Sequence, residues 1–246
     1  MQTWPLFVLT LRGDCQRRTP LLNTLKRLGL TYELFYGVDG RSGLSSAWER
    51  QINRSKARRN FGRELTDGEF ACALSHRELY KCIITRGLTG GIILEDDAIV
   101  DQAFANFVKQ AHYHHAKLML LDHAQARVLD VGLEIMPGTM IRRLALPAYL
   151  TTGYTASREA AQLLLEASTP VCHTADWPGD IVAMGAVALD PRIVDHPNQE
   201  NGPSHLRTER ESCRSKSRDV SYTLRKRFHP KHRKSRKVKK TATLIS

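Results

Sequence analysis

The sequence predicts an α/β protein in which helices flank a mixed, mainly parallel sheet. The first observation is that short apolar runs of strand length, such as residues 6–11 and 92–94, alternate with segments of helical apolar spacing. The second is that these runs lack a polar face, which is typical of strands covered on both sides. The 246 residues are enough for one such domain with a substantial core.

The N-terminal segment predicts one strand–helix–strand unit. Residues 6–11 form a strand, and Arg12-Gly13-Asp14 turns out of it. Leucines at helical spacing favour a helix over residues 16–28. Residues 31–36 return as a second strand that ends in Gly37-Val38-Asp39-Gly40. Because a crossover of this type joins parallel neighbours, we expect the first sheet contacts to be parallel.

The next segment is polar and basic before it becomes amphipathic. Residues 41–63 lack an apolar stripe and predict a loop or a solvent-facing helix with a solvated surface. Phosphate contact by one or two of their arginines is the alternative. A helix begins after Thr66, because Thr66 as N-cap and Glu69 three residues later form a capping box, and Gly87 ends it.

The stretch that follows, residues 90–98, combines a buried strand with clustered charge. Two glycines lead into the apolar run, and Glu95, Asp96 and Asp97 follow it without a gap. In open α/β sheets, ligands bind at the carboxyl ends of the strands. Adjacent carboxylates repel unless a positive charge lies between them, and oxygen ligands suit Mg2+ or Mn2+. The stretch therefore predicts a metal site, with a solvated loop or an acidic helix N-terminus as the alternative.

The C-terminal half continues the alternation of strands and helices. The expected elements are a helix over residues 102–115, a strand over 118–122, strand-and-turn segments over 127–148 and a strand over 151–157. A helix follows over residues 158–167, capped by Ser157, with Leu163, Leu164 and Leu165 facing inward. Residues 170–180 form a loop, and residues 181–189 a late strand or short helix.

Several of these segments together resemble glycosyltransferase family 25, the family of the lipooligosaccharide and collagen galactosyltransferases. The resemblance rests on residues 63–76, Arg-Glu-Leu-Thr-Asp-Gly-Glu-Phe-Ala-Cys-Ala-Leu-Ser-His, and on the Glu-Asp-Asp triplet after its strand. Support comes from residues 9–12 with Arg17-Arg18, from residues 37–40, and from Thr152-Gly153-Tyr154 followed by Ser157 and Ala160. The resemblance runs from Pro5 to Pro197 and thins after His196.

The resemblance implies a GT-A-like fold, a nucleotide-sugar donor that is usually a UDP-hexose, a divalent cation (Mn2+ or Mg2+), and inversion at the anomeric carbon. The expected activity is that of an inverting hexosyltransferase. It moves a hexose, with galactose expected, from a UDP-sugar to a saccharide acceptor such as a lipopolysaccharide or lipooligosaccharide core.

Sugar transfer itself demands two kinds of group. The leaving diphosphate needs charge neutralisation, which a bridging metal supplies, and the acceptor hydroxyl needs a base. We assign metal binding to Asp97 first and then to Glu95, with Asp96 orienting the ribose or an arginine. Asp176 is the candidate catalytic base and Asp180 the reserve. An N-cap or turn role is the alternative for both of these aspartates.

The nucleotide contacts follow from the resemblance. It places the nucleotide near the end of the first strand, at Thr10, Leu11 and Arg12, and near Asp39, for which a turn residue is the alternative. Ser75 and His76 are assigned to the sugar–phosphate pocket, although a histidine on a mostly apolar helix is usually a satisfied core residue.

The net charge of +12 at pH 7 belongs to the end of the chain. Ten of the 37 Lys and Arg lie in residues 225–240, where there is no acid, so the remainder carries 27 bases against 25 acids. We therefore expect a catalytic domain over residues 1–200 and, over residues 201–246, a polar and then basic tail that is partly disordered. Such a tail favours an anionic membrane surface and a lipid-linked oligosaccharide acceptor.

Other features favour the cytoplasmic face of the membrane as the location. The N-terminus leads into a strand without a basic leader, so we expect no signal peptide. No apolar run approaches the roughly 18–20 residues that span a bilayer. The five cysteines are odd in number and include no Cys-X-X-Cys pair, which favours reduced thiols over a disulfide framework or a zinc site.

Two alternative functions come from other classes. The excess of Lys and Arg is typical of nucleic-acid-binding proteins, but those carry a basic face on the folded body, whereas here the basic residues lie in the tail. A non-catalytic family member that only binds a nucleotide sugar is the second alternative. The intact triplet of Glu95, Asp96 and Asp97 argues against it.

Overall fold

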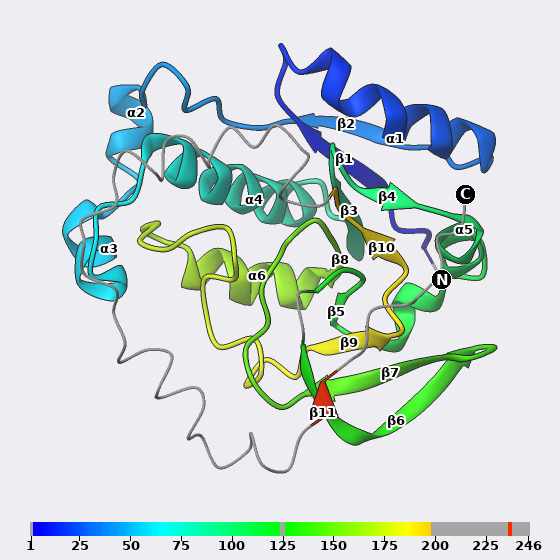
Figure 1. Cartoon of the computed structure of the whole chain (residues 1–246). Coiled ribbons are helices and arrows are strands. Elements are labelled where there is room, and N and C mark those ends of the chain that lie inside the picture. Colours follow the sequence, from blue (N-terminus) through cyan, green and yellow to red (C-terminus); the bar gives the residue numbers. More distant parts are fainter. Residues whose placement is uncertain (1, 124–125, 198–235, 238–246) are drawn as a thin grey trace.

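The computed structural model describes residues 2–123, 126–197 and 236–237 (Figure 1). Its strands are β1 (Leu6–Thr10), β2 (Glu33–Tyr36), β3 (Gly90–Glu95), β4 (Ile99–Val100), β5 (Leu118–Leu120), β6 (Arg127–Met136), β7 (Thr139–Leu144), β8 (Gly153–Ser157), β9 (Val187–Asp190), β10 (Val194–Asp195) and β11 (Arg236–Lys237). Its helices are α1 (Cys15–Arg27), α2 (Ser46–Glu49), α3 (Arg54–Phe61), α4 (Asp67–Thr85), α5 (Gln102–Lys109), the 3-10 helix η1 (His112–His115) and α6 (Arg158–Ala167).

The described strands form one nine-stranded sheet in the order β11-β6-β7-β9-β5-β8-β3-β1-β2, and β4 pairs with β10 separately. β1 is parallel to β2 and β3, and β5 is parallel to β9. The other pairings within the sheet are antiparallel. Followed across the sheet, β1, β2, β3, β5, β6 and β9 therefore point one way and β7, β8 and β11 the other. The prediction of an α/β fold with a mixed, mainly parallel sheet is confirmed.

Alternation along the central strands divides the core between the two faces of the sheet. Leu6 and Val8 of β1 belong to an apolar cluster with residues of α1 and α5, whereas Phe7 and Leu9 belong to a second cluster with residues of α4 and α6. Successive strand residues point to opposite faces, so a fully apolar run supplies both clusters. The sheet is thus the middle layer of three, with helices on both faces (Figure 1).

The carboxyl ends of β1 and β3 lie side by side. Leu9 is opposite Glu95 in the parallel pair, so the residues that follow each strand meet at one edge of the sheet. β8 runs antiparallel beside β3, and the N–H of Glu95 donates to the carbonyl of Thr152 at 2.8 Å. The segment before β8 therefore reaches the same edge. Because β3 ends at Glu95, Asp96 and Asp97 lie in the turn after it.

α4 begins with the predicted capping box. The hydroxyl of Thr66 accepts from the N–H of Glu69 at 3.1 Å, and the Glu69 carboxylate accepts from the N–H of Thr66 at 3.0 Å. The loop after β2 packs closely on this end of the helix: a Cβ on Gly40 would lie 2.5 Å from the carbonyl oxygen of Asp67. Only glycine fits that contact, so the start of α4 is fixed against this loop.

The structure corrects the bounds of two predicted helices. The helix expected over residues 102–115 ends at Lys109, and η1 follows, because Ala111 has a positive φ of 56° that a continuous helix does not allow. In α6, Leu163 is 39% exposed, contrary to the expectation that it faces inward; the buried stripe consists of Ala160, Ala161 and Leu164. Residues 181–185 form turns before β9 begins at Val187.

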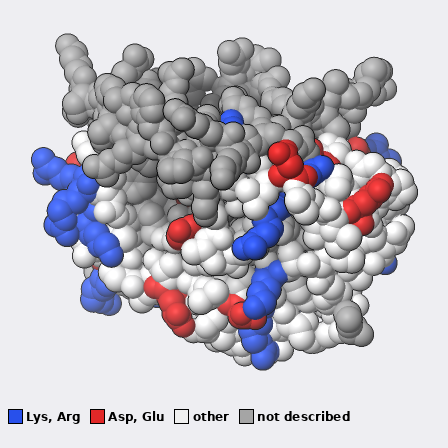
Figure 2. All heavy atoms as spheres, turned by 90° about the horizontal axis from the view of Figure 1, so that it is seen from below, with Lys and Arg blue, Asp and Glu red and all other residues white. Residues whose placement is uncertain are grey.

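Residues 41–63 contain α2 and α3, in agreement with the expected solvent-facing helix. α3 buries only Ala57, while Lys56, Arg58 and Arg59 are exposed. Lys and Arg gather at the left of Figure 2, on the side where α3 lies in Figure 1. Beneath α3, a small separate core joins Ala57 to Phe70 of α4 and to Val171 of residues 170–180, which we call the late loop. This core fixes the late loop against the N-terminal half of α4.

The described part of the chain has no helix that is both long enough and apolar enough to span a bilayer. Of the basic segment 225–240, the structure describes only Arg236 and Lys237, whose backbone forms β11 beside β6. The rest of this segment and the expected domain boundary at residue 200 lie outside the described residues. The division into residues 1–200 and 201–246 therefore stays a prediction.

Candidate functional site

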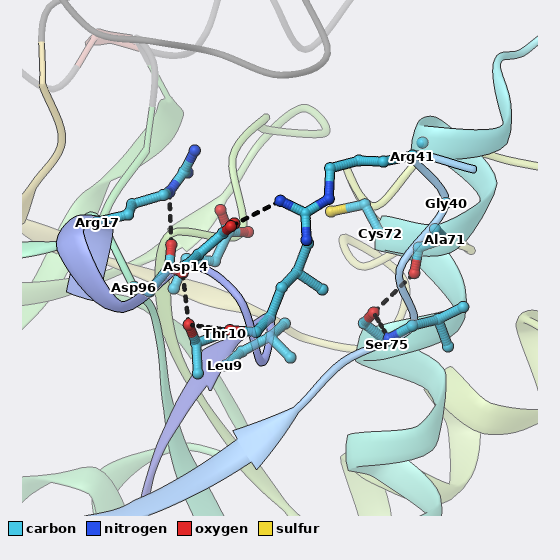
Figure 3. A pocket seen from close by; sticks show the side chains of 14 residues that line it. Leu9, Thr10, Asp14, Arg17, Gly40, Arg41, Ala71, Cys72, Ser75 and Asp96 are labelled. Atoms are coloured by element: carbon cyan, nitrogen blue, oxygen red, sulfur yellow. Dashed lines mark hydrogen bonds and ion pairs between the residues drawn. The ribbon is translucent and has the colours of Figure 1, made fainter. Parts of the chain in front are cut away.

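A pocket of about 160 Å³ opens at the edge of the sheet where β1 and β3 end, between these strand ends and the N-terminal half of α4 (Figure 3). Of the residues assigned to the nucleotide or the metal, Thr10, Leu11, Ser75, Glu95 and Asp96 line it. The other lining residues are Leu9, Asp14, Arg17, Val38, Gly40, Arg41, Gly68, Ala71 and Cys72. The structure thus brings the first strand, the acidic triplet and the Leu-Ser-His helix together.

Arg17 holds two of the three acids. Its Nε donates to Oδ1 of Asp96 and its Nη2 to Oδ2 of Asp97, both at 2.6 Å. The other oxygen of Asp96 accepts from the hydroxyl of Thr10 at 2.7 Å. A guanidinium from the first turns of α1 therefore supplies the positive charge that adjacent carboxylates require. Asp96 orients an arginine, which is one of the two roles expected of it.

Asp97 is the least satisfied of the three acids. Its Oδ2 accepts from Arg17, but its Oδ1 is buried and lacks a hydrogen-bond partner in the described part of the chain. Burial, followed by the charges of Glu95 and Asp96, raises the pKa of Asp97 to about 6, although Arg17 acts to lower it. An unpaired buried carboxylate oxygen costs free energy, so this position favours a bound cation or a proton.

Glu95 is held by hydrogen bonds instead. Its Oε1 lies 3.1 Å from Nε2 of His76 and accepts from the hydroxyl of Thr151 at 2.7 Å. Burial acts to raise the pKa of Glu95, but the hydrogen bond and charge of His76, together with Thr151 and Arg17, lower it overall. Glu95 therefore stays ionised more readily than Asp97, its neighbour in the triplet.

His76 combines features of a core residue and of a site residue. It is 1% exposed, and its Nδ1 lies 2.9 Å from the hydroxyl of the fully buried Tyr154. It does not line the pocket itself but lies behind Glu95, whose carboxylate it contacts. His76 therefore acts on the pocket through Glu95, and its direct contact with a sugar phosphate stays a prediction.

Ser75 fixes the loop after β2 on α4. Its hydroxyl accepts from the N–H of Val38 at 2.8 Å and donates to the carbonyl of Ala71 at 2.7 Å. A Cβ on Gly37 would lie 2.5 Å from this hydroxyl, so the preceding position requires glycine. Ser75 thereby sets the distance between the two walls of the pocket.

Asp39 and Arg12 lie at the margin of the pocket and do not line it. Asp39 accepts from the backbone and the guanidinium of Arg41, whose Nη1 reaches Asp14 at 2.7 Å. The guanidinium of Arg12 stacks over the ring of Tyr36 at 4.4 Å. Asp39 thus has the turn contacts named as its alternative role, and its nucleotide contact stays a prediction.

A divalent cation, which the family resemblance implies, fits the carboxylates at the border of this pocket, which Glu95 lines and Asp97 does not. Two observations on the described residues support this: the buried Oδ1 of Asp97 has no hydrogen-bond partner among them, and their hydrogen bonds to Glu95 fall on Oε1 alone. Carboxylate oxygens are the ligands that Mn2+ and Mg2+ prefer, and Arg17 neutralises only one of the three negative charges. Asp97 and Glu95 are the residues that would hold such an ion.

The two candidate bases lie in the late loop, and both accept backbone hydrogen bonds. Asp176 accepts from the N–H of Leu150 at 2.9 Å, and Leu150 has an unusual positive φ of 78°. Asp180 accepts from the N–H groups of Val182 and Ala183 at 3.0 and 3.1 Å. Asp180 therefore caps a turn, as the alternative role predicts. Neither aspartate lines the pocket, and Asp176 is linked to it only indirectly, because it fixes the residue before Thr151, which binds Glu95.

The assignments from the sequence missed Arg17, Arg41, Asp14 and Thr151. For Arg17 a signal existed, because a helix that follows the first strand of a parallel pair begins at the edge where the acidic triplet ends. In the sequence, the Arg17-Arg18 pair supports only the family resemblance. Nothing in the sequence singles out Thr151, since its position depends on the antiparallel pairing of β8 with β3.

A known protein family matches the part of the chain that contains every residue lining the pocket. The sequence model described as "Glycosyltransferase family 25 (LPS biosynthesis protein)" matches residues 3–178. Procollagen galactosyltransferase 1-B of Xenopus laevis is 30% identical over 173 residues, which cover 66% of this chain and 28% of that protein. Procollagen galactosyltransferase 1 of Danio rerio is 27% identical over 179 residues, 66% of this chain and 28% of that protein.

A third similar protein is described as inactive. The probable inactive glycosyltransferase 25 family member 3 of Rattus norvegicus is 28% identical over 176 residues, which cover 68% of this chain and 30% of that protein. The chain therefore spans less than a third of the length of these curated relatives.

Proposed function

This chain belongs to glycosyltransferase family 25. We propose that it is an inverting hexosyltransferase that moves a hexose from a UDP-sugar to a saccharide acceptor, with galactose as the first candidate for the hexose. The observation that carries the proposal is the pocket lined by Thr10, Arg17, Glu95 and Asp96, with Asp97 held beside it by Arg17. The two galactosyltransferases among its relatives support galactose as the sugar.

The charges in the pocket support a diphosphate as part of the ligand. Arg17 and Arg41 bring two guanidinium groups to its wall, and guanidinium groups recognise phosphate oxygens well. Arg17 also keeps the carboxylates of Asp96 and Asp97 in place, with Thr10 fixing the second oxygen of Asp96. When bound at Asp97 and Glu95, a divalent cation supplies the remaining neutralisation of the leaving diphosphate.

A second hollow next to the pocket supports a place for the nucleoside. It has a volume of about 400 Å³ and shares Val38 and Ser75 with the first. Tyr36, Trp48 and Asp39 line it, and they offer aromatic surface and carboxylate acceptors, which a base and a ribose require. We place the uridine here, with its diphosphate directed toward Arg17.

The acceptor hydroxyl must lose a proton, and we propose Asp176 as its base. Asp176→Asn should lower kcat by ~10²-fold or more, while the KM for the donor stays close to normal. The asparagine amide oxygen can still accept from the N–H of Leu150, so this change keeps that backbone contact while it removes the base. Asp180→Asn serves as the matched control, because its carboxylate caps a turn on the surface. A larger loss for Asp180→Asn, with Asp176→Asn almost silent, would transfer the role to Asp180.

We propose a lipid-linked saccharide, such as a lipopolysaccharide core, as the acceptor, and the basic residues 225–240 as the means of reaching it. Each Lys or Arg near an anionic membrane surface contributes roughly 1 kcal/mol to binding, so ten give reversible attachment even if few engage. Truncation after Ser221 should abolish sedimentation with anionic vesicles and slow transfer to a lipid-linked acceptor, but spare a short soluble one. Equal binding by both proteins across a salt series would contradict this.

The proposed activity is tested by a donor screen. Purified protein with Mn2+ is mixed with UDP-, GDP- and ADP-sugars and a saccharide acceptor, and the released nucleotide and the glycosylated product are measured. Product from UDP-galactose or another UDP-hexose supports the proposal. Tight binding of a UDP-sugar without product or hydrolysis would favour the second candidate function, a non-catalytic nucleotide-sugar-binding protein, of which the inactive relative is a precedent.

A further inference from the structure

Three metal-binding side chains of different chemistry meet at the inner wall of the pocket. They are Cys72, His76 and Glu95, and one ligand atom from each lies within 4.8 Å of the other two. Cys72 and His76 are four residues apart on α4, so they lie on one face of that helix, and Glu95 ends the neighbouring strand β3. The spacing of the cysteines alone gave no sign of this group, because its other members lie on a different turn and a different element.

The group is open to solvent on one side. Cys72 and Glu95 line the pocket, and Figure 3 shows the sulfur of Cys72 pointing from α4 into it. Cys72 is not part of a disulfide in the described chain. His76, by contrast, is buried behind them. An ion that enters the pocket therefore meets the sulfur and the carboxylate first, with the imidazole behind.

A second layer of hydrogen bonds holds two of the three groups. The hydroxyl of Tyr154 lies 2.9 Å from Nδ1 of His76, which leaves Nε2 directed at Glu95. Thr151 donates to Oε1 of Glu95 at 2.7 Å, and no described residue donates to Oε2. Outer partners of this kind orient imidazole and carboxylate ligands in metal sites.

The chemistry of the three groups selects the metal. A thiolate, an imidazole and a carboxylate are ligands of Zn2+, which binds three protein groups and leaves a fourth position open. Mn2+ and Mg2+ prefer oxygen ligands and gain little from sulfur. This group therefore differs in preference from the carboxylate pair of Asp97 and Glu95.

We propose that Cys72, His76 and Glu95 bind one Zn2+ ion whose fourth position faces the pocket. On binding, the Cys72 thiol releases its proton to solvent. His76 binds the ion through Nε2 and keeps its other ring proton on Nδ1, which donates a hydrogen bond to the hydroxyl of Tyr154. Glu95 cannot serve Zn2+ and the cation of the donor complex with the same oxygens. Zn2+ therefore inhibits sugar transfer, a consequence that rests on the proposed function.

The binding test uses Co2+ as a spectroscopic substitute for Zn2+ on the full-length protein. Wild type should show the near-ultraviolet charge-transfer absorption of a cobalt–thiolate bond. Added Zn2+ should displace the Co2+ and remove this absorption. Cys72→Ser should lose this absorption and bind Zn2+ at least about 100-fold more weakly, because even the loss of an outer partner costs 10–100-fold. His76→Gln should weaken Zn2+ to a similar extent. Cys82→Ser, on the same helix, is the matched control and should change nothing.

Two results would overturn the site. One is a Cys72→Ser protein, folded by circular dichroism, that keeps the cobalt–thiolate absorption or the wild-type Zn2+ affinity. The other is a loss of the absorption in Cys82→Ser. The inhibitory consequence is measured separately, as the Zn2+ concentration that halves each protein's own transfer rate. It should be at least about 10-fold higher for Cys72→Ser than for wild type. A wild type without transferase activity would refute the proposed function, while the spectroscopic result would still decide the zinc site.

Discussion

Asp97→Asn should remove nearly all sugar transfer and yet make the metal-free protein more stable at neutral pH. A metal at a leaving group contributes several kcal/mol to transition-state stabilisation, so the loss of its first ligand should lower kcat by roughly 10³-fold or more. Asparagine has the shape of aspartate but no charge to hold the cation. We expect so large a loss of transfer because Oδ1 of Asp97 is buried and has no hydrogen-bond partner among the described residues.

The gain in stability follows from the direction of the pKa shift. Burial and the neighbouring acids raise the pKa of Asp97 from 3.8 to about 6 in the folded protein. Ionised Asp97 therefore destabilises the fold: the contribution of this group to stability is most favourable below pH 4 and is lost as the pH rises through 6. The shift corresponds to about 3 kcal/mol at most. The asparagine variant has no such loss, so its advantage should be largest above pH 6 and vanish below pH 4.

Both effects are measured with one pair of proteins. Transfer rates with Mn2+ and urea unfolding in EDTA from pH 4 to pH 8 give the two quantities for wild type and Asp97→Asn. Glu159→Gln, which removes an exposed negative charge paired with Lys117, is the control and should change neither strongly. Full transfer by a folded Asp97→Asn protein, or a wild type that is indifferent to EDTA, would contradict the role of Asp97.

Arg17→Met should lower both stability and transfer, in contrast to Asp97→Asn. It removes the guanidinium that binds Asp96 and Asp97, and leaves two largely buried carboxylates without their cation. Breaking a fully buried pair costs about 3–5 kcal/mol; because Arg17 is 28% exposed, we expect roughly 2 kcal/mol at neutral pH. The cost should shrink in acid, where the carboxylates become protonated. Transfer should fall by about 10²-fold, because the positive charge that Arg17 would place near the diphosphate is lost as well.

The control for Arg17→Met lies on the same helix. Arg27 is exposed in the last turn of α1, so Arg27→Met should leave unfolding and transfer almost unchanged. Arg17→Lys should recover part of the stability but little of the transfer, since an ammonium cannot reproduce the two separate hydrogen bonds to Asp96 and Asp97. Equal losses for Arg17→Met and Arg27→Met would mean that Arg17 does not hold the acidic triplet in place.

The sequence predicts the parts of the site that depend on local pattern. The apolar runs before Leu9 and Glu95 identify buried strands, and their parallel pairing brings the acidic triplet to the carboxyl edge. The capping box at Thr66 places the start of α4 to the residue. These features follow from spacing and residue type over short distances along the chain.

The parts that were missed depend on distant contacts. Arg17 reaches Asp96 across 79 positions, and Thr151 reaches Glu95 across 56, so neither contact leaves a local pattern. The zinc group has the same property, since Glu95 comes from a different element than Cys72 and His76. Asp176 shows the converse case: the sequence predicts its loop, but its hydrogen bond with the strained Leu150 follows only from the fold.

The binding of UDP in the presence and absence of Mn2+ tests directly whether the acidic triplet forms a nucleotide-sugar site. Calorimetric titration of wild type should give a Kd at least about tenfold lower with Mn2+ than with EDTA, because we propose that Asp97 and Glu95 hold the ion that neutralises the diphosphate. Asp97→Asn should lose this difference, while Glu159→Gln keeps it. Binding of UDP that is equally tight in EDTA, or equally dependent on Mn2+ in Asp97→Asn, would contradict a nucleotide-sugar site built on the acidic triplet.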